Sequence, residues 1–174
     1  MNNNKQIAPM DHRRWYAVNV RSRHEKTVHS EFGKKGIESS LPLLSVTRQW
    51  SDRIKEIEVP WFNGYIFVKI DLNIQRFVVL ETPGVVKFIP QNKNPISIPE
   101  SQLYWLQKLI SHGTSPMREF QIPVGSPIKI LYGPFRGCDG WIKQKRSKTR
   151  IIVWLNSIMQ GVSVEFESHM LGKL

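Results

Sequence analysis

Residues that commonly carry out catalysis are few and scattered in this chain of 174 residues. Cys138, the single cysteine, lies in a glycine-rich turn with no histidine or asparagine motif beside it, so a nucleophilic role is not expected. The five histidines lack the Cys/His spacing of zinc ligands. The sequence also has no glycine-rich phosphate loop followed by Lys-Ser/Thr. We therefore expect no catalytic residue, no metal site and no cofactor.

The composition instead favours binding to polyanions. Lys and Arg number 25 against 14 Asp and Glu, which gives a formal net charge of +11. Such an excess favours nucleic acid, a nucleoprotein machine or an anionic membrane surface. No apolar stretch approaches the roughly 18 residues needed to cross a bilayer, and residues 1–11 lack the apolar core of a secretion signal. A single cysteine excludes an internal disulfide and fits a reducing compartment, so we expect a cytoplasmic protein.

Three groups of basic residues have the chemistry to contact phosphates. The first lies where a predicted strand meets a predicted helix and comprises Arg21, Arg23 and Lys26. The second lies on a predicted hairpin and adds a tryptophan that can stack on an unpaired base: Arg48, Trp50, Arg53 and Lys55. The third is a dense run near the C-terminus: Lys143, Lys145, Arg146, Lys148 and Arg150. For each group a solvated surface, or for Trp50 a fold back onto its own hairpin, remains the alternative.

The first half of the chain predicts the elements that must position these groups. Residues 15–20 (WYAVNV) predict a strand. Ser22 stands three residues before Glu25, which is the capping-box spacing, and Gly36 is placed to end the helix that follows. An apolar run at 37–44 then completes a βαβ-like opening. Residues 46–50 and 54–59 flank the polar triplet 51–53 and predict a hairpin.

The next segment predicts a buried strand and two more helices. Residues 64–70 (GYIFVKI) predict a central strand covered on both faces. Residues 72–80 predict a short helix with Phe77 and Val78 buried, and residues 82–84 (TPG) predict a turn before a strand at 85–89. Pro99 can open a last helix with apolar residues on one face.

The second half of the chain predicts a separate β domain. Short β-type runs occur at 127–131, 140–143, 150–155 and 161–166, a spacing that favours a small, strongly bent barrel. We therefore predict an α+β protein with a flexible tail at 1–12, a first domain at 13–111, a linker at 112–122 and a barrel at 123–174.

Four segments, in order and at family spacing, resemble the NusG family of transcription factors. RWYAVNV is similar to the family's opening strand, and WFNGYIFVKI is similar to its FPGYVFV strand, with Asn63 where proline is usual. VVLETPGVVKFI resembles the TPGV block, and GSPIKILYGPFRGCDGWI resembles the core of a KOW module. Within the family the chain resembles the specialised paralogues typified by RfaH and UpxY, and RHEKTVHSEFGKKGIESSLPL and RQWSDRIKEIEVPWF look closer to UpxY-type proteins than to NusG itself. The resemblance covers nearly all of the chain from Arg13 onward.

This resemblance implies an N-terminal NusG-type α/β sandwich domain that grips RNA polymerase and a C-terminal SH3-like β-barrel (KOW) domain that recruits a partner. It implies a monomeric, non-enzymatic elongation or antitermination factor that bridges the polymerase cleft and suppresses pausing and termination, often on particular operons. The factor would contact non-template DNA and nascent RNA. A general RNA- or ribosome-binding KOW protein without a polymerase role is the alternative.

The resemblance also implies specific contact residues. A concave apolar patch for a helical hairpin of the largest polymerase subunit is expected at the positions of Phe62, Tyr65, Pro83 and Phe88. Arg76 stands where RfaH-like proteins carry a Thr-rich contact to the second large subunit, although the Thr-rich pattern itself is absent. Ile158 and Met159 match an apolar loop that binds Rho or ribosomal protein S10, and the missing FGR triplet argues against Rho.

Two further expectations concern the state of the domains. We expect Trp15 in the core and Phe62 at the interface. The many β-branched residues of the C-terminal segment disfavour helix. We therefore expect no autoinhibitory helical state and a polymerase surface that is open without activation.

Overall fold

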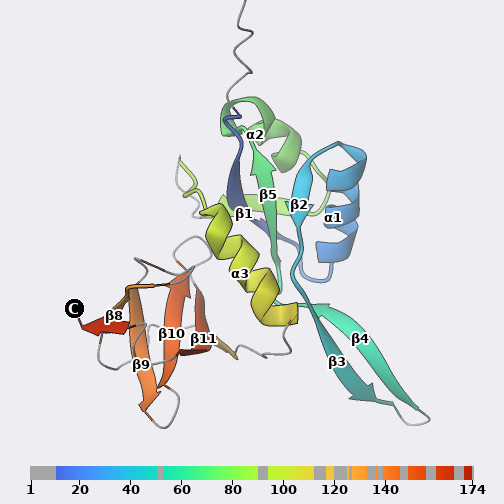
Figure 1. The fold of residues 1–174 in the computed structure, drawn as a ribbon. Coiled ribbons are helices and arrows are strands. Elements are labelled where there is room, and N and C mark those ends of the chain that lie inside the picture. Colours follow the sequence, from blue (N-terminus) through green and yellow to red (C-terminus); the bar gives the residue numbers. More distant parts are fainter. Residues whose placement is uncertain are drawn as a thin grey trace, which may run out of the picture.

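The fold is taken from a computed structural model of the chain (Figure 1). The structure describes residues 11–50, 53–89, 94–111, 117–119, 125, 127–132, 136, 139–145, 149–155, 160–166 and 171–173. Within this part it contains three helices, a four-stranded sheet, a two-stranded hairpin and a six-stranded sheet.

The four-stranded sheet forms the centre of the N-terminal half. Its order is β2 (Glu38–Ser40), β5 (Tyr65–Ile70), β1 (Arg14–Val20) and β6 (Val85–Ile89), and neighbouring strands are antiparallel. Since β1 and β2 both run against β5, they are parallel to each other with β5 between them. The predicted βαβ-like opening is therefore present with a third strand inserted. The predicted central position of residues 64–70 is confirmed.

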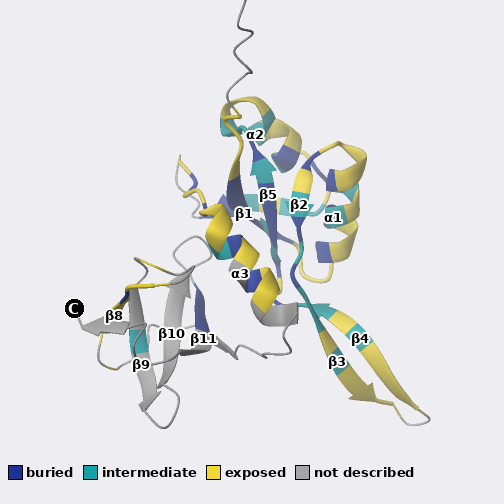
Figure 2. Ribbon diagram, viewed as in Figure 1, coloured by how far each residue is buried: buried dark blue, intermediate teal, exposed yellow. Residues whose placement is uncertain are grey.

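Side chains alternate along each strand, so each face of this sheet carries apolar residues. Helices cover both faces. Tyr16 and Val18 of β1 pack with Val28 and Phe32 of α1 (Glu25–Lys34) and with Val79 of α2 (Leu72–Leu80). On the other face, a second cluster joins sheet residues to α3 (Glu100–Ser111), as Figure 2 shows by burial. From β1, β5 and α3, that second cluster contains Trp15, Ala17, Phe67, Leu103 and Leu106. The result is a three-layer domain with α1 and α2 on one side and α3 on the other.

The ends of α1 match the sequence prediction at only one terminus. Ser22 does not cap the helix, because His24 occupies the N-cap position. The His24 side chain makes no capping hydrogen bond. At the other end, Gly36 has φ +69°, and the Ile37 N–H donates to the Phe32 carbonyl, as in a Schellman motif. The predicted end at Gly36 is therefore confirmed, whereas the predicted capping box is wrong.

Helix α2 also differs from the prediction in the face that it buries. Asp71 caps it by accepting from the Asn73 N–H at 2.9 Å, and the predicted helix is present. Its Val79 is buried, but Phe77 is 70% and Ile74 is 75% exposed, and Val78 is exposed as well. The prediction that Phe77 and Val78 are buried is wrong, because the strongest apolar spacing in this helix faces away from the sheet.

The remaining helix, α3, is tied to the sheet by a polar contact. Lys69 of β5 donates to Glu100 at 3.0 Å, and this contact raises the pKa of Lys69 and lowers the pKa of Glu100. The helix begins one residue after Pro99, whose carbonyl accepts from the Gln102 N–H at 3.0 Å.

A two-stranded hairpin extends from the base of β5 (Figure 1). It consists of β3 (Leu43–Gln49) and β4 (Ile54–Pro60), paired antiparallel from Leu43 opposite Pro60 to Gln49 opposite Ile54. The Trp50 N–H donates to the Arg53 carbonyl at 2.8 Å and closes the turn. The hairpin predicted from the sequence is confirmed, with longer arms than predicted.

The C-terminal half forms a six-stranded antiparallel sheet of order β12-β8-β9-β10-β11-β7. Its strands are β7 (Met117–Glu119), β8 (Pro127–Ile130), β9 (Asp139–Lys145), β10 (Thr149–Leu155), β11 (Gln160–Phe166) and β12 (Leu171–Lys173). All four predicted strands are present. β7 lies inside the predicted linker and pairs with β11, so the second sheet begins earlier than predicted.

The helices in the described ranges include none long and apolar enough to cross a membrane.

Candidate nucleic-acid interface

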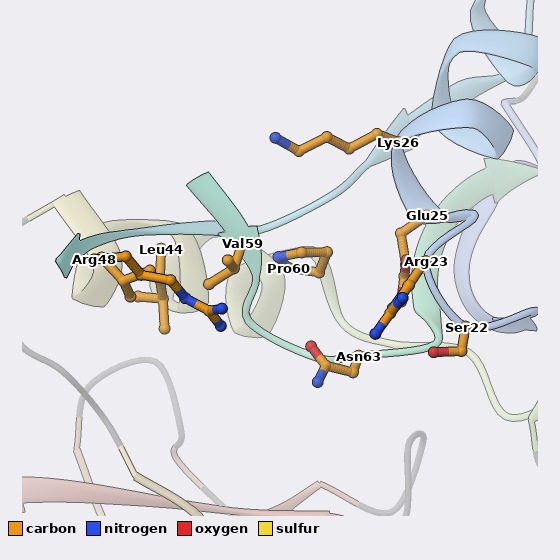
Figure 3. Close-up of a pocket in the computed structure, with 10 residues that line it drawn as sticks. Ser22, Arg23, Glu25, Lys26, Leu44, Arg48, Val59, Pro60 and Asn63 are labelled. Carbon is orange, nitrogen blue, oxygen red and sulfur yellow. The ribbon is translucent and has the colours of Figure 1, made fainter. Parts of the chain in front are cut away.

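A cleft of about 710 Å³ lies between the loop that joins β1 to α1 and the base of the β3–β4 hairpin (Figure 3). One wall is cationic and polar, and the other is apolar and comes from the hairpin. The cleft is lined by Ser22, Arg23, Glu25, Lys26, Leu44, Val46, Arg48, Val59, Pro60 and Asn63. It therefore brings together the first and second of the basic groups that the sequence predicts, although they are more than twenty residues apart.

The rear of the cleft is fixed by a buried carboxylate. Glu25 is 4% exposed, and its Oε1 accepts from the Gly64 N–H at 2.7 Å. The Gly64 carbonyl in turn accepts from the Val20 N–H and from the Asn19 amide, both at 2.8 Å. Gly64 has φ +78°, which favours glycine. Glu25 therefore holds the segment carrying Asn63 against the β1–α1 loop, instead of serving the predicted capping box.

Arg23 enters the cleft from a strained turn. The His24 N–H donates to the Arg21 carbonyl at 3.1 Å, and Arg23 between them has φ +64°. It is the one residue other than glycine with positive φ in the described part of the chain. A left-handed conformation costs a residue with a Cβ about 1 kcal/mol. The surrounding hydrogen bonds maintain this conformation, and Figure 3 shows the Arg23 side chain extending toward Asn63.

The hairpin separates charge onto its two faces. Arg48 lies opposite Lys55, and the pair Trp50 and Arg53 follows in the same register. Because cross-strand partners and alternate residues share a face, these four side chains lie on one face with the cleft-lining Leu44 and Val46. Glu56 and Glu58, opposite Thr47 and Ser45, lie on the other face. Trp50 is 55% exposed, so the basic face carries an accessible aromatic ring.

The predicted nucleic-acid residues do not all reach the cleft. Arg23, Lys26 and Arg48 line it, but Arg21 does not. Lys26 also lies 4.0 Å from Glu58, an exposed ion pair of the kind that contributes little to stability. The cations best placed for a ligand in the cleft are therefore Arg23 and Arg48.

The apolar patch predicted for polymerase is not assembled as expected. Phe62 is 1% and Phe88 is 4% exposed, and the two belong to different core clusters on opposite faces of the sheet. Phe62 packs edge-on against Phe67, and Phe88 packs edge-on against Tyr16. Trp15 is buried, as expected, and Phe62, which we expected at the interface, is buried as well. Phe88 lies on β6 and packs on the α1–α2 face of the sheet, whereas Phe62 lies in the turn before β5 and packs on the α3 face.

Other members of that set remain accessible. Pro83 is exposed, and Tyr65 and Arg76 are half-buried. The cluster around Phe62 also contains Ile128 and Ile130 of β8. The expectation of a fully open surface is therefore not met at Phe62. Contact of Tyr65, Pro83 and Arg76 with polymerase stays a prediction.

The predicted C-terminal sites fall largely outside the described residues. Arg146, Lys148, Ile158 and Met159 lie outside them, and Lys143 and Lys145 are described only as backbone positions on β9. Their roles in RNA and protein binding stay predictions.

Sequence reasoning missed two features of this domain. Asn63 and the apolar wall of Leu44, Val46, Val59 and Pro60 were not identified as part of a site. The departure of Asn63 from the proline usual in the resembling motif was the available signal. The exposed stripe on α2, formed by Ile74, Phe77 and Val78, gave no signal, because periodicity does not reveal which face a helix buries.

The arrangement is suited to binding. In the described part of the chain, no group of three or more His, Cys, Asp or Glu side chains could hold a metal ion. The cleft offers guanidinium donors, an amide and an apolar wall. Guanidinium groups are common phosphate ligands, and amide and apolar groups commonly contact bases of an unpaired strand.

Comparison with known proteins assigns the family. A family model described as transcription termination factor NusG matches residues 13–107, more than half of the chain. The NusG proteins of Helicobacter pylori (26% identity, 75% of this chain, 80% of that protein) and Pseudomonas aeruginosa (25%, 93% and 99%) are similar in sequence. A structure described as domain interaction in Thermotoga maritima NusG shares the fold, with a TM-score of 0.51, 20% identity and 93% of this chain covered. The chain therefore belongs to the NusG family of transcription termination and antitermination factors.

Proposed function

We propose that this protein is an elongation or antitermination factor that binds RNA polymerase, bridges its cleft and suppresses pausing and termination by binding alone. The observation that carries the proposal is the presence of two unlike exposed surfaces on one rigid three-layer domain. One is the cationic cleft with the basic hairpin face, and the other is the apolar stripe of Ile74, Phe77 and Val78 on α2.

The two surfaces are well separated. The hairpin precedes β5 in the chain and α2 follows it, so they lie at opposite ends of the strand (Figure 1). A single element thus holds a nucleic-acid surface and a protein-type surface apart. That arrangement suits a factor that contacts polymerase at one end and the exposed non-template strand at the other.

The exposed stripe on α2 revises the expected second contact. The Thr-rich pattern of RfaH-like proteins is absent, but Phe77 and Ile74 provide large accessible apolar side chains beside Arg76. Exposed apolar patches bordered by polar residues commonly mark protein interfaces. We assign this stripe to the polymerase.

Three finer parts of the proposal rest on sequence motifs. The segments similar to UpxY-type paralogues support a role on particular operons. The KOW-like segment supports a closed SH3-like barrel formed by the second sheet, and a partner site at Ile158 and Met159. The basic run from Lys143 supports contact with nascent RNA.

The test is a transcription assay with purified bacterial RNA polymerase, together with a pull-down on the full-length chain. We expect polymerase to co-purify, pauses to shorten and read-through of terminators to rise. Co-sedimentation with ribosomes without polymerase association would instead favour the general RNA- or ribosome-binding alternative.

A further inference from the structure

The cleft between the β1–α1 loop and the hairpin has the composition of a site for one nucleotide. Its volume, about 710 Å³, lies within the roughly 300–1,000 Å³ of small-ligand pockets. Its apolar wall consists of Leu44, Val46, Val59 and Pro60. These aliphatic side chains can pack against the face of a base, which is too polar at its edges to be buried without partners.

The polar groups beside this wall are available for a ligand. Asn63 is exposed, and within the described residues its side chain makes no hydrogen bond. Arg23 and Arg48 are likewise unpaired with any described residue. In Figure 3 the Asn63 amide and the ends of the two arginine side chains lie around the same cleft. A cleft lined by one amide and two guanidinium groups presents one base-reading group and two phosphate-binding groups.

The backbone on either side of Asn63 is fixed before any ligand arrives. Phe62, on one side of it, is fully packed in the core, and Gly64, on the other, is held by the Glu25 carboxylate at 2.7 Å. Because the backbone is held in place, only the Asn63 side chain has to be ordered on binding, which lowers the entropic cost. Arg23 projects from a turn of positive φ, and strain of this kind is concentrated at functional sites.

We propose that this cleft binds a single unpaired nucleobase of single-stranded nucleic acid, with Asn63 reading the base edge and Arg23 and Arg48 holding the adjacent phosphates. Asparagine pairs bidentately with the N6 and N7 atoms of adenine, so the preferred base is adenine. This inference rests on the proposed function, since it adds base preference to the nucleic-acid surface of the same domain.

An acidic peptide is the competing occupant. It would satisfy the two arginines, and its backbone amides can pair with the Asn63 side chain, but its carboxylate side chains place no flat ring against the aliphatic wall as a base does. Replacement of Asn63 would then change affinity without changing any preference among bases.

The test measures fluorescence anisotropy of labelled single-stranded oligonucleotides of equal length with the full-length chain. Oligo-dA, oligo-dC and oligo-dT form one arm, and the corresponding RNA oligomers form a second arm that separates a DNA from an RNA source. Asn63→Ala is compared with Asn73→Ala, an exposed asparagine at the start of α2. Arg23→Gln and Arg48→Gln are compared with Arg14→Gln, at the other end of β1.

Three results are expected. The unmodified chain prefers adenine, and Asn63→Ala weakens adenine binding on the order of tenfold while Asn73→Ala leaves it unchanged. Asn63→Asp, which offers only acceptors, shifts the preference toward cytosine. Arg23→Gln and Arg48→Gln each reduce the salt slope by about 0.7 and keep the base preference.

Equal affinity for all bases, or a preference that persists in Asn63→Ala, would overturn the inference. So would an acidic peptide that competes for the cleft better than the oligonucleotides do. Failure of the proposed function is a separate result, seen as absent polymerase association and unchanged pausing with the unmodified chain.

Discussion

At the scale of single residues, Glu25 shows how a charged side chain can serve structure at the edge of a binding site. Its carboxylate is the partner of the buried Gly64 N–H. We expect Glu25→Ala to lower the free energy of unfolding by about 1–3 kcal/mol, because a buried donor loses its acceptor. Glu25→Gln keeps an acceptor and should cost less. Urea denaturation measures both.

The control is Glu31→Ala on the same helix, whose carboxylate pairs with Lys34 at the surface. Surface pairs of this kind contribute at most about 1 kcal/mol. Equal effects of Glu25→Ala and Glu31→Ala would show that the Gly64 contact does not hold the cleft together.

Phe62 gives a second prediction at this scale. Because it is 1% exposed and packs against Trp61 and Phe67, Phe62→Ala should cost roughly 3–5 kcal/mol of stability through the cavity left behind. Thermal unfolding of the variant tests this. A normal melting temperature with weakened polymerase binding would restore the interfacial role that the sequence suggested.

At the scale of elements, α2 separates a structural face from a functional one. Phe77→Ala removes an exposed side chain, so we expect stability to change by less than about 0.5 kcal/mol. If α2 contacts polymerase, the same change should weaken that binding by about 2 kcal/mol. Val79→Ala, on the buried face of the helix, is the matched control and should mainly lower stability. Undiminished binding by Phe77→Ala would remove α2 from the interface.

The hairpin offers neighbouring residues of opposite charge on opposite faces. Lys55 shares a face with Trp50 and Arg48, whereas Glu56 lies on the other face. We expect Lys55→Gln to weaken single-strand binding and to reduce its dependence on salt, since one phosphate contact is lost. Glu56→Gln should not weaken binding. Filter binding over a range of salt concentrations compares them, and equal effects would mean that only net charge matters.

At the scale of the whole molecule, the boundary of the second sheet can be tested. Because β7 pairs with β11, a segment that starts at residue 112 should give a stable β-type circular dichroism spectrum. A segment that starts at residue 123 lacks β7 and should melt at a lower temperature. Identical melting of the two segments would show that β7 adds nothing, and helical signal from either would contradict the β fold.

The sequence by itself determined the order of the helices and strands and the kind of partner that the protein's charge favours. Runs of β-branched and aromatic residues identified β1 and β5, the turn at residues 82–84 marked the start of β6, and Gly36 marked the end of α1, because these signals depend on local geometry. The charge of +11 and the basic groups at Arg23 and Arg48 indicated a polyanionic partner without any fold. The motif resemblance indicated the family that residues 13–107 confirm.

Tertiary structure decided which faces are buried and which distant residues meet. Phe77 and Phe62 are both apolar, yet Phe77 on α2 is exposed and Phe62, in the turn before β5, is core, because the sheet covers only one face of α2 whereas Phe62 packs against Phe67. Asn63, Arg23 and Arg48 become one site only when Glu25 ties the Gly64 segment to the β1–α1 loop. Contacts between residues so far apart in the chain depend on packing, which local periodicity does not encode.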